Sequence, residues 1–222
     1  MRIVLLGAPG AGKGTYCKKI SARYGVSHLS SGDILRKERS ADSELGREAQ
    51  EYMDSGALVP DALIVKMMAG AVRESSSSGY VLDGFPRTVS QAVELDELLA
   101  AEKQDIDAAL NLVITDEVVF SRMTGRRSCP KCGAVYHLTN LPPKADGLCD
   151  NDGTELIQRP DDELEVVKKR LETYHRITEP VSDYYRKKGI IYDVEADKDV
   201  DEVCVHLFER LDIVDASAHR RA

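Results

Sequence analysis

The chain has 222 residues and a mass of 24.5 kDa, which is long enough for one α/β core with room for insertions. Its hydrophobic content of 42% and charged content of 31% are ordinary for a globular protein, and they argue against wholesale disorder, a collagen or a coiled coil. The net charge of −8 argues against a protein that binds duplex nucleic acid by neutralising its phosphates.

The apolar segments of the sequence are too short for a membrane span, which requires roughly 18 residues. The first of them, residues 3–6, is interrupted at once by Gly7 and Pro9. We therefore expect no signal peptide, no membrane association and a cytoplasmic location, in which cysteines stay reduced or bind metal.

Five short segments rich in apolar and β-branched residues alternate with helical patterns along the chain. They are residues 2–6, 26–29, 80–82, 109–114 and 190–194. Strands that alternate with helices in this way form a parallel sheet that is covered on both faces. The sequence therefore predicts an α/β fold with a five-stranded parallel sheet.

Two segments between these strands are longer than a crossover requires. Residues 30–59 contain two helical patterns, at 33–39 and 44–53, and are expected to form a helical insertion. Residues 125–162 contain three of the five cysteines and little periodicity, and are expected to form a second insertion. We expect the core to consist of residues 1–29, 60–124 and 163–222.

An amphipathic helix is predicted directly after the second insertion. Pro160 and the acidic residues 161–163 suit its first turn, and we expect it to end near Pro180 or to restart there. Its apolar stripe consists of Leu164, Val167, Leu171, Tyr174 and Ile177. We also expect a polar loop at residues 75–78 and a solvated tail at 216–222.

A glycine-rich run joins the first strand to the first helix. It reads Gly7-Ala8-Pro9-Gly10-Ala11-Gly12-Lys13-Gly14-Thr15. In such a loop, backbone N–H groups surround an anion at the helix N-terminus while the lysine reaches the β- and γ-phosphates. The hydroxyl comes at Thr15 instead of directly after the lysine. The run predicts a phosphate-binding loop.

A carboxylate, Asp83, ends the predicted strand at 80–82. Ligands of open α/β sheets bind at the carboxyl ends of the strands, so Asp83 is placed where a ligand would bind. A carboxylate in that place suits Mg²⁺, which takes few protein ligands and keeps several waters.

The cysteines of the second insertion have the spacing of a structural zinc site. Cys129-x-x-Cys132 is followed, after sixteen residues, by Cys149-x-x-Asp152, in which Asp152 stands where a fourth cysteine would be. We take Asp152 as the fourth ligand; the other candidates are His137, Asp146 and Asp150. The remaining cysteines, Cys17 and Cys204, are interpreted as buried apolar residues.

Further motifs follow the phosphate loop in a fixed order. They are Ser30-Ser31-Gly32-Asp33, Leu82-Asp83-Gly84-Phe85-Pro86-Arg87 with Gln91, Gly125-Arg126-Arg127, Val135-Tyr136-His137, Arg159-Pro160-Asp161-Asp162 and Lys169-Arg170-Leu171. From Met1 to about Leu211, the chain resembles the adenylate kinases in their long form, whose lid is a separate small metal-binding domain. Phosphoryl transfer depends on positioning and on cations around the transferred group, which agrees with the number of arginines in these motifs.

The resemblance implies reversible transfer between ATP and AMP, giving two ADP, by a P-loop enzyme that is a monomer, uses Mg²⁺ and holds structural Zn²⁺ in its lid. The implied catalytic residues are Lys13, Arg87, Arg126, Arg159 and Arg170. The implied ATP contacts are Gly10, Ala11, Gly12, Lys13, Gly14, Thr15, Arg122, Arg126, Val135, Tyr136 and Lys198. The implied AMP contacts are Ser31, Arg36, Ala57, Leu58, Val59, Gly84, Phe85, Pro86, Arg87, Gln91, Arg159 and Arg170. The implied metal ligands are Cys129, Cys132, Cys149 and Asp152 for zinc, with Thr15 and Asp83 near magnesium through water.

Two alternatives remain open at this point. Ser31 stands where many adenylate kinases have threonine, so the acceptor could be another nucleoside monophosphate such as UMP or CMP. A zinc-ribbon nucleic-acid binder with an ATPase core is the other alternative, but the charge argues against it. Residues 94–107 and 193–202 each contribute −5, so the rest of the chain carries +2 and gathers its arginines in the motifs.

Overall fold

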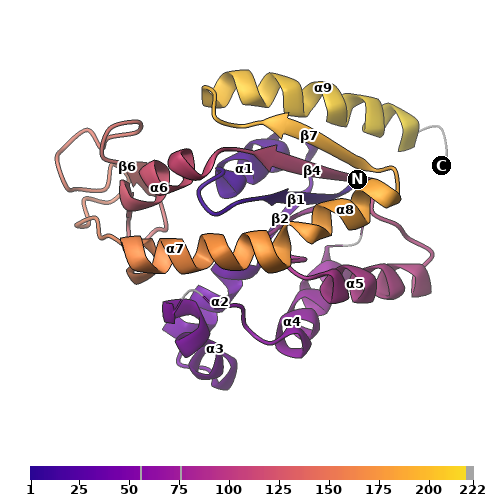
Figure 1. Ribbon diagram of the computed structural model, residues 1–222, viewed down its shortest axis with the longest axis horizontal. Helices are drawn as coiled ribbons and strands as arrows, with labels where there is room; N and C mark the ends of the chain where they lie inside the picture. Colours follow the sequence, from indigo (N-terminus) through magenta and orange to yellow (C-terminus); the bar gives the residue numbers. More distant parts are fainter. Residues whose placement is uncertain (56, 76, 219–222) are drawn as a thin grey trace.

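The computed structural model describes residues 1–55, 57–75 and 77–218 (Figure 1). Its centre is a five-stranded parallel sheet in the order β2-β3-β1-β4-β7. The predicted α/β fold is therefore confirmed, and each strand begins and ends within one residue of the expected position. The strands are β1 (Arg2–Gly7), β2 (Ser27–Ser30), β3 (Tyr80–Asp83), β4 (Ala108–Val113) and β7 (Ile191–Glu195).

Helices cover both faces of the sheet because alternate residues of each strand point to opposite sides. Ile3 and Leu5 of β1 pack with α1 and α9, whereas Val4 and Leu6 pack on the other side with α4, α5 and α8. These core helices are α1 (Lys13–Tyr24), α4 (Asp61–Glu74), α5 (Val89–Ala101), α6 (Asp116–Thr124), α7 (Leu164–Thr173), α8 (Pro180–Lys187) and α9 (Val200–Ala218).

The segment between β2 and α4 forms the expected pair of helices, α2 (Ser31–Ser40) and α3 (Glu44–Ser55). The Ser30 hydroxyl caps α2 by accepting a hydrogen bond from the Asp33 backbone N–H at 3.2 Å. The two helices pack closely at Gly46, where a Cβ would lie 2.4 Å from the Glu38 carbonyl oxygen. We call residues 30–59 the helical insertion.

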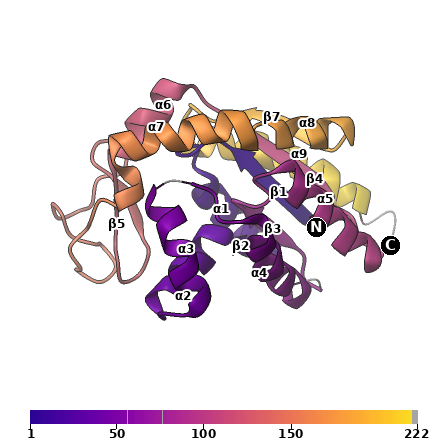
Figure 2. The ribbon, with the colours of Figure 1, turned by 60° about the horizontal axis from the view of Figure 1, so that its bottom comes forward.

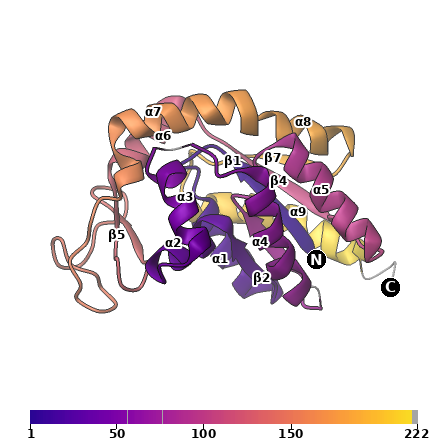
Figure 3. The ribbon, with the colours of Figure 1, turned by 90° about the horizontal axis from the view of Figure 1, so that it is seen from below.

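The second insertion, residues 125–162, forms a small lobe that we call the cysteine lobe. Its two-stranded antiparallel sheet consists of β5 (Arg126–Ser128) and β6 (Val135–His137). Only a few apolar side chains, including Tyr136, form its core. Figures 2 and 3 show the lobe and the helical insertion at the same end of the molecule, away from the N-terminus.

The long helix predicted after the cysteine lobe is divided into four parts. A short 3-10 helix, Pro160–Asp162, precedes α7, so α7 begins at Leu164 and not at Pro160 as expected. A π-helical segment, Tyr174–Thr178, then joins α7 to α8, which restarts at Pro180. The predicted restart is confirmed.

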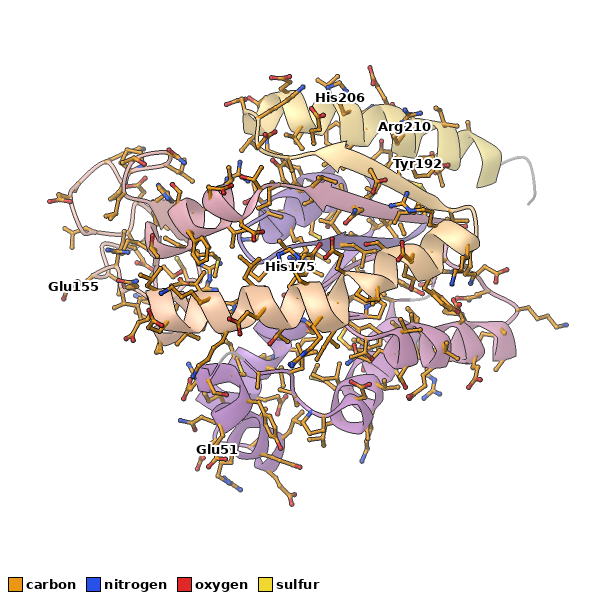
Figure 4. All side chains as sticks on the ribbon, viewed as in Figure 1. Glu51, Glu155, His175, Tyr192, His206 and Arg210 are labelled. Carbon is orange, nitrogen blue, oxygen red and sulfur yellow. The ribbon has the colours of Figure 1, made fainter. Side chains whose placement is uncertain are left out.

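His175 of the π-helical segment connects this helix to α6 (Figure 4). Its Nδ1 lies 2.9 Å from the Glu179 carboxylate and its Nε2 lies 3.0 Å from the Asp116 carboxylate. These two contacts raise the pKa of His175, although partial burial opposes them. The imidazole therefore fixes the end of α7 against the helix that leads into the cysteine lobe.

The predicted tail at 216–222 is wrong in its first part, because α9 continues to Ala218. Residues 219–222, and residue 76 of the predicted polar loop, lie outside the described residues. Within the described ranges, we find no helix with the length and apolar character that crossing a bilayer demands.

Candidate active site

The phosphate loop connects β1 to α1 in a conformation that depends on its glycines. Gly10 and Gly12 have positive φ angles of 78° and 89°, a region that side chains disfavour. A Cβ on Gly12 would also lie 2.8 Å from the Tyr16 ring, which is buried beneath the loop. The first turn of α1, beginning at Lys13, therefore directs its N–H groups toward the space enclosed by the loop.

Lys13 folds back over this loop. Its ammonium donates hydrogen bonds to the carbonyl oxygens of Gly7, at 2.7 Å, and Ala8, at 2.9 Å. Burial lowers the pKa of Lys13 to about 8, with Asp83 opposing the shift and the positive charges of Arg87 and Arg170 adding to it. An anion bound in the loop would relieve this cost, because it supplies the missing negative charge.

Asp83 lies at the end of β3 and faces the phosphate loop from the sheet. Its Oδ2 atom lies 3.4 Å from the place that a Cβ on Gly14 would take, and 3.3 Å from the Nε2 atom of His28. The carboxylate is therefore at the carboxyl edge of the sheet, beside the start of α1, as expected from its place after the strand.

A pocket opens between the helical insertion and the edge of the sheet, with about 620 Å³ of empty space including its mouth. It contains many of the residues expected to contact AMP, and these come from segments up to about 140 positions apart. The expected residues that line it are Ser31, Arg36, Ala57, Leu58, Val59, Gly84, Arg87, Gln91 and Arg170.

Three expected AMP contacts are not part of this lining. Phe85 belongs to the main apolar core, and Pro86 follows it through a cis peptide bond. Arg159 is placed near Arg126 and Arg36, whose charges, together with burial, lower its pKa to about 10.

Five further residues line the pocket and were not expected as contacts. They are Gly32, Leu35, Met53, Ile64 and Asp161. Gly32 and Asp161 lie within the quoted motifs, so closer attention to each whole motif would have found them. Leu35, Met53 and Ile64 are apolar helix positions, which the sequence pattern does not distinguish from core positions.

Gln91 is nearly fully buried and both ends of its amide are engaged. Its Oε1 accepts a hydrogen bond from the Arg87 backbone N–H, and its Nε2 donates one to the Asp61 carboxylate, both at 2.7 Å. Asp61 also accepts a hydrogen bond from the Thr88 hydroxyl at 2.8 Å. Sequence reasoning missed Asp61, whose link to Gln91 fixes the backbone that carries Arg87.

Arg87 itself is half-buried at the pocket, and its charge acts on Lys13. Its Nε donates to the Gly84 carbonyl oxygen at 2.7 Å. Burial and the nearby charge of Arg170 lower its pKa to about 10, which still leaves the guanidinium positive at neutral pH. Arg36, on the other side of the pocket, donates from Nη2 to Asp33 Oδ1 at 2.5 Å.

The other arginines are held by two consecutive carboxylates at the base of the cysteine lobe. Arg126 donates from Nε and Nη2 to the two oxygens of Asp162, at 2.8 and 2.5 Å, and Asp162 is fully buried. Arg170 donates from Nη1 to the backbone and carboxylate oxygens of Asp161, at 2.8 and 2.6 Å. The site thus has guanidinium groups from the sheet edge, the cysteine lobe and α7, and acids orient the last two.

Comparison with known proteins shows which protein family has this arrangement. A sequence model described as adenylate kinase matches residues 5–190 of the chain. An adenylate kinase from Archaeoglobus fulgidus is 48% identical over 204 residues, which cover 91% of this chain and 94% of that protein. The chain belongs to the adenylate kinase family. It is a phosphotransferase that converts ATP and AMP reversibly into two molecules of ADP.

Other relatives extend the match over nearly the whole length. An adenylate kinase from Lachnospira eligens is 48% identical over 91% of this chain and 96% of its own. Another, from Caldicellulosiruptor saccharolyticus, is 44% identical over 96% of this chain and its own full length. Both insertions are therefore part of the shared sequence.

The residues expected to contact the donor nucleotide lie on three separate elements of the enzyme. Arg122 lies in the last turn of α6, where its charge acts on Tyr16 beneath the phosphate loop. Val135 is exposed on β6, and Lys198 lies between β7 and α9, paired with Glu202 at 3.1 Å.

Tyr136 has a different environment from the one expected for an ATP contact. Its ring is buried in the core of the cysteine lobe, and its hydroxyl accepts a hydrogen bond from the Asp150 backbone N–H at 2.8 Å. A contact of Tyr136 with a nucleotide would therefore be made by its backbone atoms.

The predicted zinc ligands of the enzyme come together in the cysteine lobe. One ligand atom from each of Cys129, Cys132, Cys149 and Asp152 lies within 4.8 Å of the other three. The sulfur atoms of Cys132 and Cys149 are 3.5 Å apart, and Cys129 is 3.5 Å from the Asp152 carboxylate. The donor set and its spacing fit a tetrahedral metal ion.

Neighbouring groups favour the ligand form of two members of this cluster, Cys129 and Asp152. The Cys132 backbone N–H donates to the Cys129 sulfur at 3.4 Å. Hydrogen bonds from Thr154 lower the pKa of Asp152 to about 2, which keeps its carboxylate charged. His137, the competing candidate, is directed elsewhere, with its Nε2 3.2 Å from the Ser121 carbonyl oxygen.

Proposed function

We propose that the pocket of the helical insertion binds AMP, that the phosphate loop binds ATP, and that the cysteine lobe is a lid over the donor. In this proposal, residues 30–59 are the AMP-binding domain, residues 125–162 the lid, and residues 1–29, 60–124 and 163–222 the core. The observation that carries the proposal is the convergence of Lys13, Arg87 and Arg170, whose charges act on one another between the loop and the pocket.

The arrangement supports in-line phosphoryl transfer between two bound nucleotides. Lys13 and the loop N–H groups hold the donor phosphates, while Arg36 and Arg87 hold the acceptor phosphate. The remaining arginines, Arg126, Arg159 and Arg170, surround the group that is transferred. Because such a transition state spreads negative charge over the transferred oxygens, fixed cations in a dry site stabilise it.

The carboxylates that hold these arginines orient them in advance. Arg170 has two Nη1 contacts to Asp161, and its Nη1 lies 3.8 Å from Asp162. Phosphate oxygens are good acceptors for the same planar guanidinium donors. When a nucleotide binds, its phosphate oxygens therefore replace carboxylate oxygens as the hydrogen-bond acceptors of these arginines. Because the arginine side chains are already held in place, they lose little conformational entropy when the site closes.

Magnesium is the cofactor that adenylate kinases use with ATP, and the residues here fit it. Asp83 offers a carboxylate oxygen beside Gly14, and Thr15 offers a hydroxyl in the first turn of α1. Bound there, mostly through water, Mg²⁺ would supply positive charge to the donor phosphates. We further propose that the enzyme works in the cytoplasm as a monomer, with ATP, AMP and ADP as its partners.

Zinc has a structural role in this proposal. Three thiolates and Asp152 would close a four-ligand site, leaving no position for a reacting group. The cysteine lobe has few buried apolar residues, so the metal replaces the cohesion that a core would provide.

The test of the proposed function is a coupled assay of ADP formation from ATP with AMP, UMP or CMP as the acceptor. We expect AMP to exceed the others in kcat/KM by at least about 100-fold, a difference of roughly 2.7 kcal/mol. Ser31 donates a hydrogen bond to the Gly84 carbonyl oxygen at 2.7 Å. Because Ser31→Thr keeps the hydroxyl, it should change the AMP preference by less than about tenfold. Equal rates with UMP or CMP would refute the AMP assignment.

The lowered pKa of Lys13 predicts a pH dependence. The folded enzyme loses this proton near pH 8, whereas an unfolded chain keeps it until about 10.5. Above pH 8 the neutral amine attracts ATP less, so kcat/KM for ATP should fall with a slope approaching −1. The same shift makes the free energy of unfolding rise between pH 8 and 10.5, because the unfolded chain binds more protons. In Lys13→Arg, the residual activity should not decline near pH 8, and an unchanged decline would contradict the assignment.

Replacing Cys129 by serine is expected to release the zinc. The wild-type enzyme should keep one tightly bound zinc per chain after gel filtration, and Cys129→Ser should keep less than about a tenth of that. Thermal unfolding should begin roughly 5–10 °C lower, as expected for a loss of a few kcal/mol. The matched control is Cys204→Ser, a buried cysteine outside the cluster. Unchanged zinc content in Cys129→Ser, measured by atomic absorption, would contradict the zinc assignment.

A further inference from the structure

A second group of metal-ligating side chains lies beneath the phosphate loop. One ligand atom from each of Cys17, His28 and Asp83 lies within 4.8 Å of the other two. Cys17 is fully buried, and the side chains of His28 and Asp83 are only 15% and 13% exposed. The three groups are therefore enclosed together, unlike the scattered carboxylates of a protein surface.

Three different elements bring these residues together. β2 and β3 are parallel neighbours in which His28 is opposite Val81 and Asp83 is opposite Ser30. Cys17 lies on α1, four positions after Lys13 and so one turn along the same helix face. The sequence separations are long, so the group exists only because the sheet order places β2 beside β3.

The donor set is that of a thiophilic divalent cation. A sulfur, an imidazole nitrogen and a carboxylate oxygen suit Zn²⁺, Co²⁺ or Cd²⁺, whereas Mg²⁺ prefers oxygen alone. A tetrahedral zinc ion holds nitrogen and oxygen ligands about 3.3 Å apart, as its bond lengths of about 2.0 Å require. The Nε2 atom of His28 and Oδ2 of Asp83 already have a separation of 3.3 Å. Three protein ligands leave the fourth position to water.

We propose that Cys17, His28 and Asp83 form a second metal site, which binds a thiophilic cation such as Zn²⁺ and thereby inhibits phosphoryl transfer. The inhibition rests on the proposed function, because it follows from removing Asp83 from its place near Mg²⁺. Binding replaces the proton of the Cys17 thiol with the metal, and that proton passes to the solvent.

This site should be weaker than the cysteine cluster, because it offers three protein ligands instead of four. Burial raises the pKa of the Cys17 thiol, so the metal must displace a firmly held proton. The positive charge of Lys13 favours the Cys17 thiolate by lowering its pKa, but it also repels a cation bound beside Asp83. The lobe site should therefore fill first, and the second site should fill only when metal is added.

Binding is tested by titrating Co²⁺ into the full-length enzyme that already holds one tightly bound zinc. We expect one added Co²⁺ per chain, with the near-ultraviolet absorption of a thiolate-to-cobalt transition. Cys17→Ala should remove that absorption, and His28→Gln should weaken binding at least about tenfold. Cys204→Ala, the matched control, should bind like the wild type. The same absorption in Cys17→Ala would overturn the proposed site.

Inhibition is tested by adding Zn²⁺ to the coupled assay at constant Mg²⁺ and ATP. Cys17→Ala should keep the basal rate and require at least about tenfold more zinc for half inhibition. Equal zinc sensitivity in Cys17→Ala, despite cobalt binding at Cys17 in the wild type, would overturn the inhibition. A failure of the proposed function is distinguishable, because it would appear as a lack of AMP phosphorylation without any zinc.

Discussion

Replacing Lys13 by methionine is expected to lower kcat roughly 10³-fold while leaving the melting temperature nearly unchanged. The loss follows from the position of the ammonium, which bonds to the Gly7 and Ala8 carbonyl oxygens at the rim of the phosphate loop. From there it can stabilise charge that develops on the transferred phosphoryl group. Methionine has a similar length but no charge, so it removes this stabilisation alone.

The stability of the Lys13→Met variant follows from the pKa of the lysine. A pKa lowered to about 8 means that the fold disfavours the charged form of this side chain. Removing the charge therefore relieves a desolvation cost and offsets the two lost hydrogen bonds. Circular dichroism and thermal unfolding should both match the wild type.

The matched control for this variant is Lys18→Met, because Lys18 lies on the exposed face of the same helix. Its kcat in the coupled assay should remain within about twofold of the wild type, as for most surface substitutions. A Lys13→Met enzyme that keeps more than a tenth of the activity would contradict the role given to the ammonium. So would a large loss of activity accompanied by unfolding.

The sheet and the phosphate loop could be predicted because their signals are local. Apolar β-branched runs predict strands wherever they occur, and the glycines of residues 7–15 are required by the positive φ angles at Gly10 and Gly12. The cysteine cluster, including Asp152, could also be predicted, since two ligand pairs at fixed spacing need only two turns to bring them together.

The partners of the site residues could not be predicted, because they depend on contacts across the chain. Gln91 and Asp61 are thirty residues apart, and their hydrogen bond exists only because α4 packs on α5. Cys17 reads as an apolar helix position, and it is buried as expected. Its neighbours His28 and Asp83 follow from the order of the strands, which composition and periodicity do not specify.

The interruption of the helix after the cysteine lobe has a similar explanation. In the sequence, Tyr174 and Ile177 continue the apolar stripe of a single α-helix. The periodicity therefore gives no sign of the π-helical segment that the structure has at these residues. His175 in this segment contacts Asp116 of α6 and Glu179 at the start of α8. One imidazole therefore joins the π-helical segment to both neighbouring helices.

The distribution of charge also became clear only in the structure. Exposed acids such as Glu51 on α3 and Glu155 in the cysteine lobe lie at the periphery of the molecule (Figure 4). Two of the acids, Asp161 and Asp162, instead lie inside the site and hold arginines. An acidic protein can therefore present a cationic centre to two nucleotides.

Replacing Arg170 by methionine is expected to lower kcat about 10³-fold, as for other arginines that act on a transferred phosphoryl group. Arg170 lines the acceptor pocket, and its charge acts on both Lys13 and Arg87. Like Arg87, it thus adjoins both the donor side and the acceptor side of the site. Arg170→Lys should recover only part of the rate, because an ammonium lacks the planar pair of donors.

A purely structural role for Arg170 predicts a different outcome. A substitution of Asp161 distinguishes this structural role from the catalytic one. Burial disfavours the charge of Asp161, yet the Arg170 and Arg126 guanidinium groups hold its pKa below the ordinary value. Arg170→Met leaves this carboxylate without its 2.6 Å partner and should therefore lower the melting temperature. Adding Asp161→Asn removes the buried charge and should restore much of that temperature.

If Arg170 acts on the transferred group, the double variant Arg170→Met with Asp161→Asn should be stable and still slow. Single-turnover rates by rapid quench measure this directly, with Lys169→Met, at an exposed position of the same helix, as the control. Recovery of kcat together with the melting temperature would instead mean that Arg170 only neutralises Asp161. Asp161, which lies just before α7, has Arg170 as its charge partner and also sets the direction of that guanidinium. Stability and catalysis are therefore expected to separate only when both partners are changed.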